Sequence, residues 1–204
     1  MSRWSEDLIS VERAGTLDGL FLQRVRRSPG RVAYRFHDRD RGWQQLDWRE
    51  MGEAVARWRA ALAAEHLATG DRVAMLLRNC PEWVMFDQAA LALGLVTVPL
   101  YTDDRAENAA YILQDAAVKV LLVQDASRWK RLAEVVGAAP WPLRVVLLDG
   151  GAEAQRLAAA DPRVVVADTW LPTDAPHLTA REGDPGALAT IVYTSGTTGR
   201  PKGV

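Results

Sequence analysis

The sequence predicts an α/β fold in which βαβ units form a mostly parallel, doubly wound sheet, with a β-hairpin near the N-terminus. Two observations lead to this prediction. Short runs rich in β-branched residues alternate with amphipathic helical segments, which is the pattern of parallel strands joined by crossover helices. One run, 95–100, is almost wholly apolar, as expected of a strand that is buried on both faces of a parallel sheet.

The first third of the chain is predicted to contain the hairpin between two helices. Polar residues 38–41 separate two β-rich runs and suit the turn of a hairpin. Asp47, with Glu50 three residues later, resembles a capping box at the start of a long helix. The predicted elements are a loose lead-in over 1–16, a helix from Leu17 to about Ser28, strands over 31–37 and 42–46, and a helix from Trp48 to about Leu67.

Strands and helices then alternate as far as residue 166. Pro81 opens one of these helices at its first turn, where proline is tolerated. The predicted strands are 72–77, 95–100, 118–123, 143–148 and 163–166, and the predicted helices are 81–93, 103–113, 127–136 and 152–159. Residues 171–186 are rich in Pro, Asp and Thr and are predicted to be a connection that leads to a final buried strand, 188–193.

Composition argues against several classes of protein. A formal charge of −1 and a pI near 6.3 argue against a nucleic-acid binder, and the basic stretch 24–41 is interpreted as a solvated helix face and hairpin. The longest apolar run, 89–101, is too short to span a membrane, and no signal peptide precedes it, so a soluble, cytoplasmic protein is expected. The single cysteine, Cys80, fits a reducing compartment, and the three isolated histidines predict no metal site.

The last twelve residues, 193–204, carry the strongest functional signal. They read Tyr-Thr-Ser-Gly-Thr-Thr-Gly-Arg-Pro-Lys-Gly-Val and follow the predicted final strand. Glycines let the backbone approach a ligand, while hydroxyls, free N–H groups and a lysine donate to anionic oxygens. The common P-loop pattern cannot be laid on the segment, because Gly203 follows Lys202 where Ser or Thr should stand. A phosphate-binding loop is predicted in preference to an ordinary surface loop.

This segment closely resembles the phosphate-loop signature of the adenylate-forming (AMP-binding) superfamily, which includes acyl-CoA synthetases. Upstream stretches are similar to long-chain fatty-acid–CoA ligases in particular: 77–83, 90–101 and 111–115. The resemblance implies that residues 17–204 form part of the N-terminal AMP-binding domain of such a ligase, ending at the loop 193–204. The oligomeric state is not implied.

The resemblance also implies a two-step reaction. A fatty-acid carboxylate attacks ATP to give an acyl-adenylate and pyrophosphate, and the thiol of coenzyme A then displaces AMP, with Mg²⁺ assisting the first step. The implied roles are hydrogen bonds from Thr194, Ser195, Thr197 and Thr198 to the β- and γ-phosphates, close backbone approach at Gly196 and Gly199, and charge compensation of pyrophosphate by Lys202.

No catalytic residue and no metal ligand is assigned in this chain, because the resemblance places those groups downstream of Val204. Residues 1–204 alone are therefore expected to be inactive and to expose an apolar edge at 188–193. Two alternatives remain open: a truncated, non-catalytic fragment with at most weak nucleotide binding, and an interaction module without chemistry.

Overall fold

The computed structural model describes residues 7–137, 143–194 and 200–204. Its helices are α1 Val11–Ala14, α2 Leu17–Arg27, α3 Trp48–Ala63, α4 Pro81–Leu91, α5 Ala106–Asp115, α6 Ala126–Val136, α7 Ala152–Ala160 and α8 Ala167–Trp170. Its strands are β1 Val32–Asp38, β2 Gly42–Asp47, β3 Arg72–Leu76, β4 Val96–Pro99, β5 Val118–Val123, β6 Arg144–Leu147, β7 Val164–Val166, β8 Tyr193–Thr194 and β9 Lys202–Gly203.

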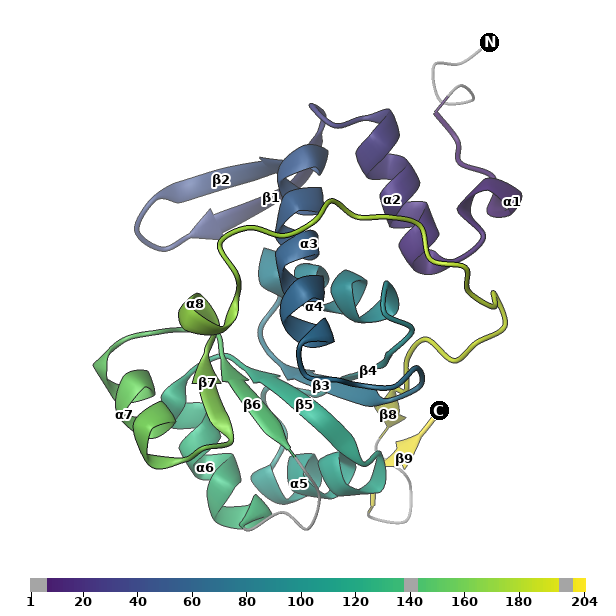
Figure 1. The fold of residues 1–204 in the computed structure, drawn as a ribbon. Helices are drawn as coiled ribbons and strands as arrows, with labels where there is room; N and C mark the ends of the chain where they lie inside the picture. The colour runs from purple at the N-terminus through teal and green to yellow at the C-terminus, as the bar shows by residue number, and fades with distance from the viewer. Residues whose placement is uncertain (1–6, 138–142, 195–199) are drawn as a thin grey trace.

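A five-stranded parallel sheet in the order β4-β3-β5-β6-β7 forms the centre of the molecule, and β1 and β2 form a separate antiparallel hairpin. Helices α5, α6 and α7 cover one face of the sheet, and α3 and α4 cover the other (Figure 1). After β4 the chain reverses direction across the sheet, because β4 lies on one side of β3 and the next strand, β5, lies on the other. The predicted doubly wound α/β fold with an N-terminal hairpin is confirmed.

The central strand β5 explains why the strand segments are apolar throughout. Leu121 and Val123 belong to the core under α5 and α6, whereas Val120 and Leu122 belong to the core under α3 and α4. All four side chains are fully buried. Burial of each such side chain contributes roughly 1.5–3 kcal/mol, so a polar residue on either face would destabilise the sheet.

Basic side chains line the amino-terminal edge of the sheet, where the covering helices end. The Arg72 guanidinium donates to the carbonyl of Ala116 at the end of α5 (2.5 Å), and Arg163 donates to the carbonyl of Gly137 at the end of α6 (2.8 Å). Carbonyl groups at helix C-termini lack intrahelical donors and carry partial negative charge. These arginines therefore stabilise the helix ends.

Most predicted boundaries agree with the structure within a few residues, but after the lead-in the helices differ from the prediction at three places. The helix predicted from Asp103 begins at Ala106, because Asp104 accepts hydrogen bonds from the Arg105 backbone N–H and the Asn108 side chain and thus precedes the helix. The short helix α8 was not predicted. The helix predicted to end near Leu67 ends at Ala63.

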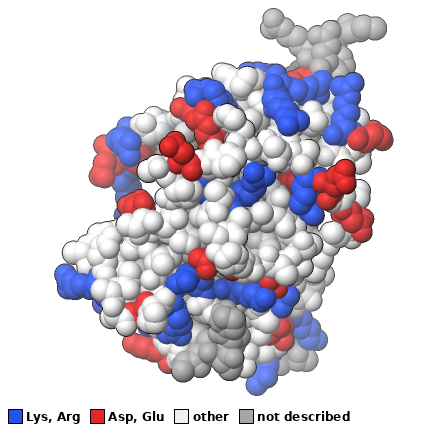
Figure 2. All heavy atoms as spheres, viewed as in Figure 1, with Lys and Arg blue, Asp and Glu red and all other residues white. Residues whose placement is uncertain are grey.

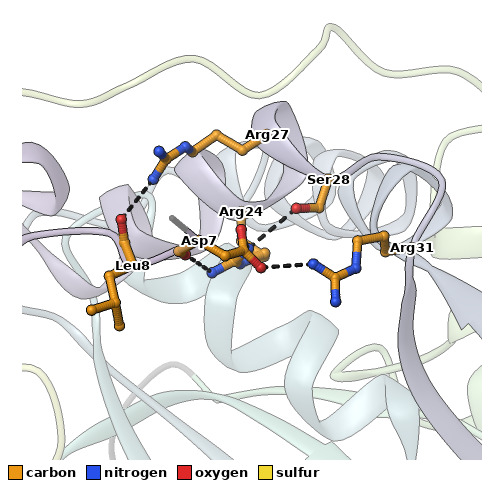
Figure 3. Close-up of polar contacts among 6 residues, drawn as sticks. All are labelled: Asp7, Leu8, Arg24, Arg27, Ser28 and Arg31. Carbon is orange, nitrogen blue, oxygen red and sulfur yellow. Dashed lines mark hydrogen bonds and ion pairs between the residues drawn. The ribbon is translucent and has the colours of Figure 1, made fainter. Parts of the chain in front are cut away.

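The described part of the lead-in, residues 7–16, is attached to the domain and contains the short helix α1. The Asp7 carboxylate accepts hydrogen bonds from Arg24 (2.6 Å) and Arg31 (2.7 Å), while Arg27 donates to the carbonyl of Leu8 (2.9 Å) (Figure 3). The hydrogen bond from Arg24 is the main reason that the pKa of Asp7 is lowered. Three arginines of the basic stretch thus hold the lead-in in place.

Charges of both signs are interspersed on the face shown in Figure 2. At the turn of the hairpin, Arg41 forms an ion pair with Asp38 at 3.9 Å. Among the described residues, no helix combines the length and the hydropathy needed to cross a bilayer.

A long connection brings the C-terminal segment to the β4 edge of the sheet. It leaves α8, passes over α3 and descends beside the sheet to β8 (Figure 1). Arg57 Nε donates to the carbonyl of Pro172 (2.7 Å) along this path. At its end, the Thr97 N–H donates to Ala189 and the Thr97 carbonyl accepts from the Ile191 N–H, both at 2.9 Å. The connection predicted over 171–186 therefore leads to the sheet edge.

The predicted final strand 188–193 is shorter than expected. Only Thr190 forms a parallel bridge, to Thr97, before β8 begins at Tyr193. Leu188 is 60% exposed and Val192 is 38% exposed, so the run is not buried as the sequence suggested. The segment lies at the edge of the sheet beside β4.

Asp87 on α4 is expected to lower the stability of the fold at neutral pH. Burial raises the pKa of Asp87, so its ionised form is less favourable in the folded state than in the unfolded chain. The cost exists above the raised pKa and disappears as the pH falls toward 3.8, the value without burial. The substitution Asp87→Asn should raise the free energy of unfolding at pH 7 by about 1 kcal/mol, with a smaller gain at pH 4, as measured by urea denaturation.

The matched control is Asp161→Asn. The hydrogen bond from Arg163 lowers the pKa of Asp161, so this change should destabilise the fold at pH 7. Stabilisation by both substitutions, or by neither, would contradict the assignment.

Candidate functional site

The ends of the predicted phosphate loop are joined in an antiparallel pair. Thr194 of β8 pairs with Lys202 of β9, and Tyr193 pairs with Gly203. Val192 and Val204 extend the pair, each N–H donating to the other's carbonyl at 3.0 and 2.9 Å. Strands this short are marginal alone, so they need support from the rest of the fold.

The pair places two predicted phosphate ligands side by side. Thr194 and Lys202 are directly opposite each other, and residues opposite each other in an antiparallel pair have their Cβ atoms only about 4.5–5.5 Å apart. Both residues are exposed, so the hydroxyl and the ammonium group are accessible to a ligand. The remaining predicted ligands, Ser195, Gly196, Thr197, Thr198 and Gly199, lie outside the described residues.

Tyr193 points to the opposite side of the strand from Thr194, because side chains alternate along a strand. Its ring is 5% exposed and belongs to the core with α5, and its hydroxyl donates to Asp115 Oδ2 at 2.6 Å. Burial raises the pKa of Tyr193, as does the bond to Asp115, so the hydroxyl stays protonated. Tyr193 therefore packs against the domain rather than facing a ligand.

Arg200, directly after the undescribed residues, also lies against α5. Its guanidinium is 5.5 Å from the centroid of the Tyr111 ring, and the residue is exposed. A cation in this position contributes about 0.5–1 kcal/mol at an exposed site. Both ends of the predicted loop thus contact the same helix.

A cavity of about 480 Å³ lies beyond the carboxyl ends of β5, β6 and β7. Gln124, directly after β5, and Asp149, two residues after β6, line it, and the Gln124 amide donates to both carboxylate oxygens of Asp149 at 3.0 Å. This edge is where open α/β sheets bind ligands. We did not select these residues from the sequence, although their position after predicted strands was a usable signal.

The described residues offer neither a metal cluster nor an activated thiol. Among them, no group of three or more His, Cys, Asp or Glu side chains is placed to hold a metal ion. Burial raises the pKa of the Cys80 thiol to about 12, so the thiol is protonated at neutral pH. Since the thiolate is the nucleophile, Cys80 is unsuited to covalent catalysis.

Comparison with known proteins identifies a family and similar structures for this chain. The model of the AMP-binding enzyme family matches residues 21–204. The long-chain-fatty-acid–CoA ligase FadD15 of Mycobacterium bovis is 34% identical over 168 residues, which cover 79% of this chain and 26% of that protein. The 3-hydroxybenzoate–CoA/4-hydroxybenzoate–CoA ligase of Thauera aromatica is 30% identical over 161 residues, which cover 79% of this chain and 29% of that protein.

A solved structure supports the fold. The fatty acyl CoA synthetase of Mycobacterium tuberculosis superimposes with a TM-score of 0.70 at 24% identity, covering 93% of this chain and 34% of that one. This structural similarity supports the fold described above, a parallel sheet with a separate hairpin. The chain spans about a quarter to a third of the length of the curated relatives it matches.

The burial of Cys80 predicts low thiol reactivity. At pH 8 the folded chain should react with a maleimide at least tenfold more slowly than the chain unfolded in urea, because little thiolate forms in the folded state. Mass spectrometry of time-quenched samples measures both rates. Equal rates would contradict the assignment of Cys80 as a buried, protonated thiol.

Proposed function

The chain belongs to the AMP-binding enzyme family, and from this membership we propose that it supplies the ATP phosphate site of an AMP-forming acyl-CoA ligase. The observation that carries the proposal is the exposed pair Thr194 and Lys202, held opposite each other in β8 and β9. The proposed ligands of the ATP phosphates are Thr194, Ser195, Gly196, Thr197, Thr198, Gly199 and Lys202.

The chemistry proposed for this site is electrostatic. Attack of a carboxylate on the α-phosphorus of ATP releases pyrophosphate, and negative charge grows on phosphoryl oxygens as the bond breaks. A hydroxyl donor at Thr194 and a cation at Lys202 stabilise that charge if they are positioned in advance. Coenzyme A is the proposed acceptor in the second step.

Mg²⁺ is the proposed metal of the reaction, where it would neutralise phosphate charge. Because the described residues lack a cluster of three metal-binding side chains, we propose that Mg²⁺ arrives bound to ATP rather than at a preformed site in this part of the protein. The reducing environment that suits a lone cysteine leads us to propose a cytoplasmic location.

A long-chain fatty acid is the proposed carboxylate substrate. Its support is the 34% identity to a long-chain-fatty-acid–CoA ligase, compared with 30% to a hydroxybenzoate–CoA ligase.

The intact protein that carries this chain should catalyse ATP–pyrophosphate exchange that depends on a long-chain fatty acid. Radiolabelled pyrophosphate measures the exchange, with palmitate, 4-hydroxybenzoate and octanoate compared at equal concentration. Faster exchange with 4-hydroxybenzoate than with palmitate would contradict the fatty-acid proposal and favour an aryl carboxylate as the substrate. ATP binding without exchange would favour a non-catalytic role. Residues 1–204 alone are expected to give no exchange, because they span only about a quarter of the FadD15 relative.

Replacing Lys202 with alanine in the intact protein should slow the exchange by about 10²-fold, the scale of losing one preorganised charge-stabilising donor. The control is Lys130→Ala, which removes an exposed lysine that is paired with Glu153 on α7. An unchanged exchange rate in Lys202→Ala would contradict the assignment of Lys202 as a ligand of the ATP phosphates.

A further inference from the structure

We infer that Asp115 and Tyr111 of α5 are positioning residues for the phosphate site, because together they contact Tyr193 of β8 and Arg200, two residues before β9. This inference rests on the proposed function, since it assigns a purpose to contacts that orient Thr194 and Lys202. Neither α5 residue was selected from the sequence as a site residue.

The first contact fixes which way the hairpin faces. Tyr193 donates to Asp115 Oδ2 at 2.6 Å from the core side of β8. Because successive side chains alternate, Thr194 then points to the other side. Lys202, opposite Thr194, shares that side. The hydrogen bond at Tyr193 therefore determines the direction in which the two proposed ligands project.

The second contact is steric. The Tyr193 ring lies against the backbone of Gly203, its partner in β9, and a Cβ at Gly203 would be 3.1 Å from that ring and 2.9 Å from Ile191 Cγ2. A glycine allows the ring to cover the neighbouring strand. Fixing the Tyr193 ring thus also fixes β9, which carries Lys202.

The third contact comes from Tyr111, one turn before Asp115 on α5. Its hydroxyl donates to the other carboxylate oxygen, Asp115 Oδ1, at 3.4 Å. Its ring lies under the Arg200 guanidinium at 5.5 Å. Asp115 and Tyr111 therefore hold Tyr193 on one side of the predicted loop and Arg200 on the other.

The geometry assigns Asp115 a role through Tyr193 rather than through the ligand. Its carboxylate lies on the side of β8 opposite to Thr194, where it accepts the Tyr193 and Tyr111 hydroxyls. A carboxylate on the ligand side would repel phosphate, whereas one on the far side can orient the strand without that cost.

The test measures binding of MgATP and of inorganic tripolyphosphate by calorimetry in the intact protein. Tyr193→Phe and Asp115→Ala should each raise Kd for both ligands about tenfold, the consequence of losing a hydrogen bond to a charged group. The double variant should bind no more weakly than Asp115→Ala, because that single variant already removes the bond between Tyr193 and Asp115. Tyr111→Phe should have a smaller effect, since its bond is longer.

The matched control is Tyr101→Phe, which removes a hydroxyl from a tyrosine that is 64% exposed, and its Kd should not change. A merely structural role predicts a lower melting temperature with an unchanged Kd, measured well below that temperature. This outcome would overturn the inference.

Hydrogen exchange separates this inference from the proposed function. The amides of Val192 and Val204 donate across the strand pair and should exchange about tenfold faster in Tyr193→Phe if the bond to Asp115 holds the hairpin. Absence of MgATP binding by the unsubstituted protein would overturn the proposed function, while the exchange rates would still decide whether α5 holds the hairpin. Unchanged rates would overturn the positioning role.

Discussion

The hydrogen bonds between Thr97 and the segment 189–191 are the constraint on which the proposed site depends. They are the point at which a connection of about twenty residues, beginning after β7, rejoins the sheet at its opposite edge. Thr97 is 2% exposed, so its peptide groups need partners from the protein. The segment supplies those partners, and β8 starts two residues after it. The hairpin of β8 and β9 therefore lies beside β4, because the peptide groups of Thr97 in β4 require hydrogen-bond partners.

The two edges of the sheet carry different kinds of chemistry. At the amino-terminal edge, arginines such as Arg72 and Arg163 bind the carbonyl groups at helix ends, and their donors are engaged within the protein. At the carboxyl-terminal edge, residues such as Gln124 and Asp149 line an open cavity. A cavity of about 460 Å³ also lies at the amino-terminal edge, so the two edges differ in the chemistry of their side chains rather than in the presence of space. The carboxyl-terminal edge is the one at which open α/β sheets bind ligands.

The hairpin of β8 and β9 separates anchoring from binding by the alternation of its side chains. Tyr193 is buried and its raised pKa keeps the hydroxyl a donor, while Thr194 and Lys202 are exposed on the opposite side. Tyr193 and Arg200, on either side of the predicted loop, both contact α5, which is why a helix outside the motif matters to the motif.

The sequence by itself determined the fold class, the order of the strands along the chain and the family. Local patterns carry this information: β5 was predicted at its observed bounds because five of its six residues are apolar or β-branched and the run lies between turn signals. The sequence also identified the segment 193–204, because its glycines, hydroxyls and lysine are adjacent in the chain. It could not show that Thr194 and Lys202 are paired, since pairing is a contact across eight residues.

Only the tertiary structure decided the side of α5 against which that segment lies, and the partners of Tyr193 and Arg200. Asp115 is 78 residues from Tyr193 in the chain, and no local periodicity reports such a contact. The same reason explains the overestimated burial of 188–193: an apolar run predicts a strand, but the number of neighbours that cover it is set by the topology of the sheet. Chemistry that depends on adjacent residues can be identified from the sequence, whereas pairing between distant residues depends on the tertiary packing of the whole chain.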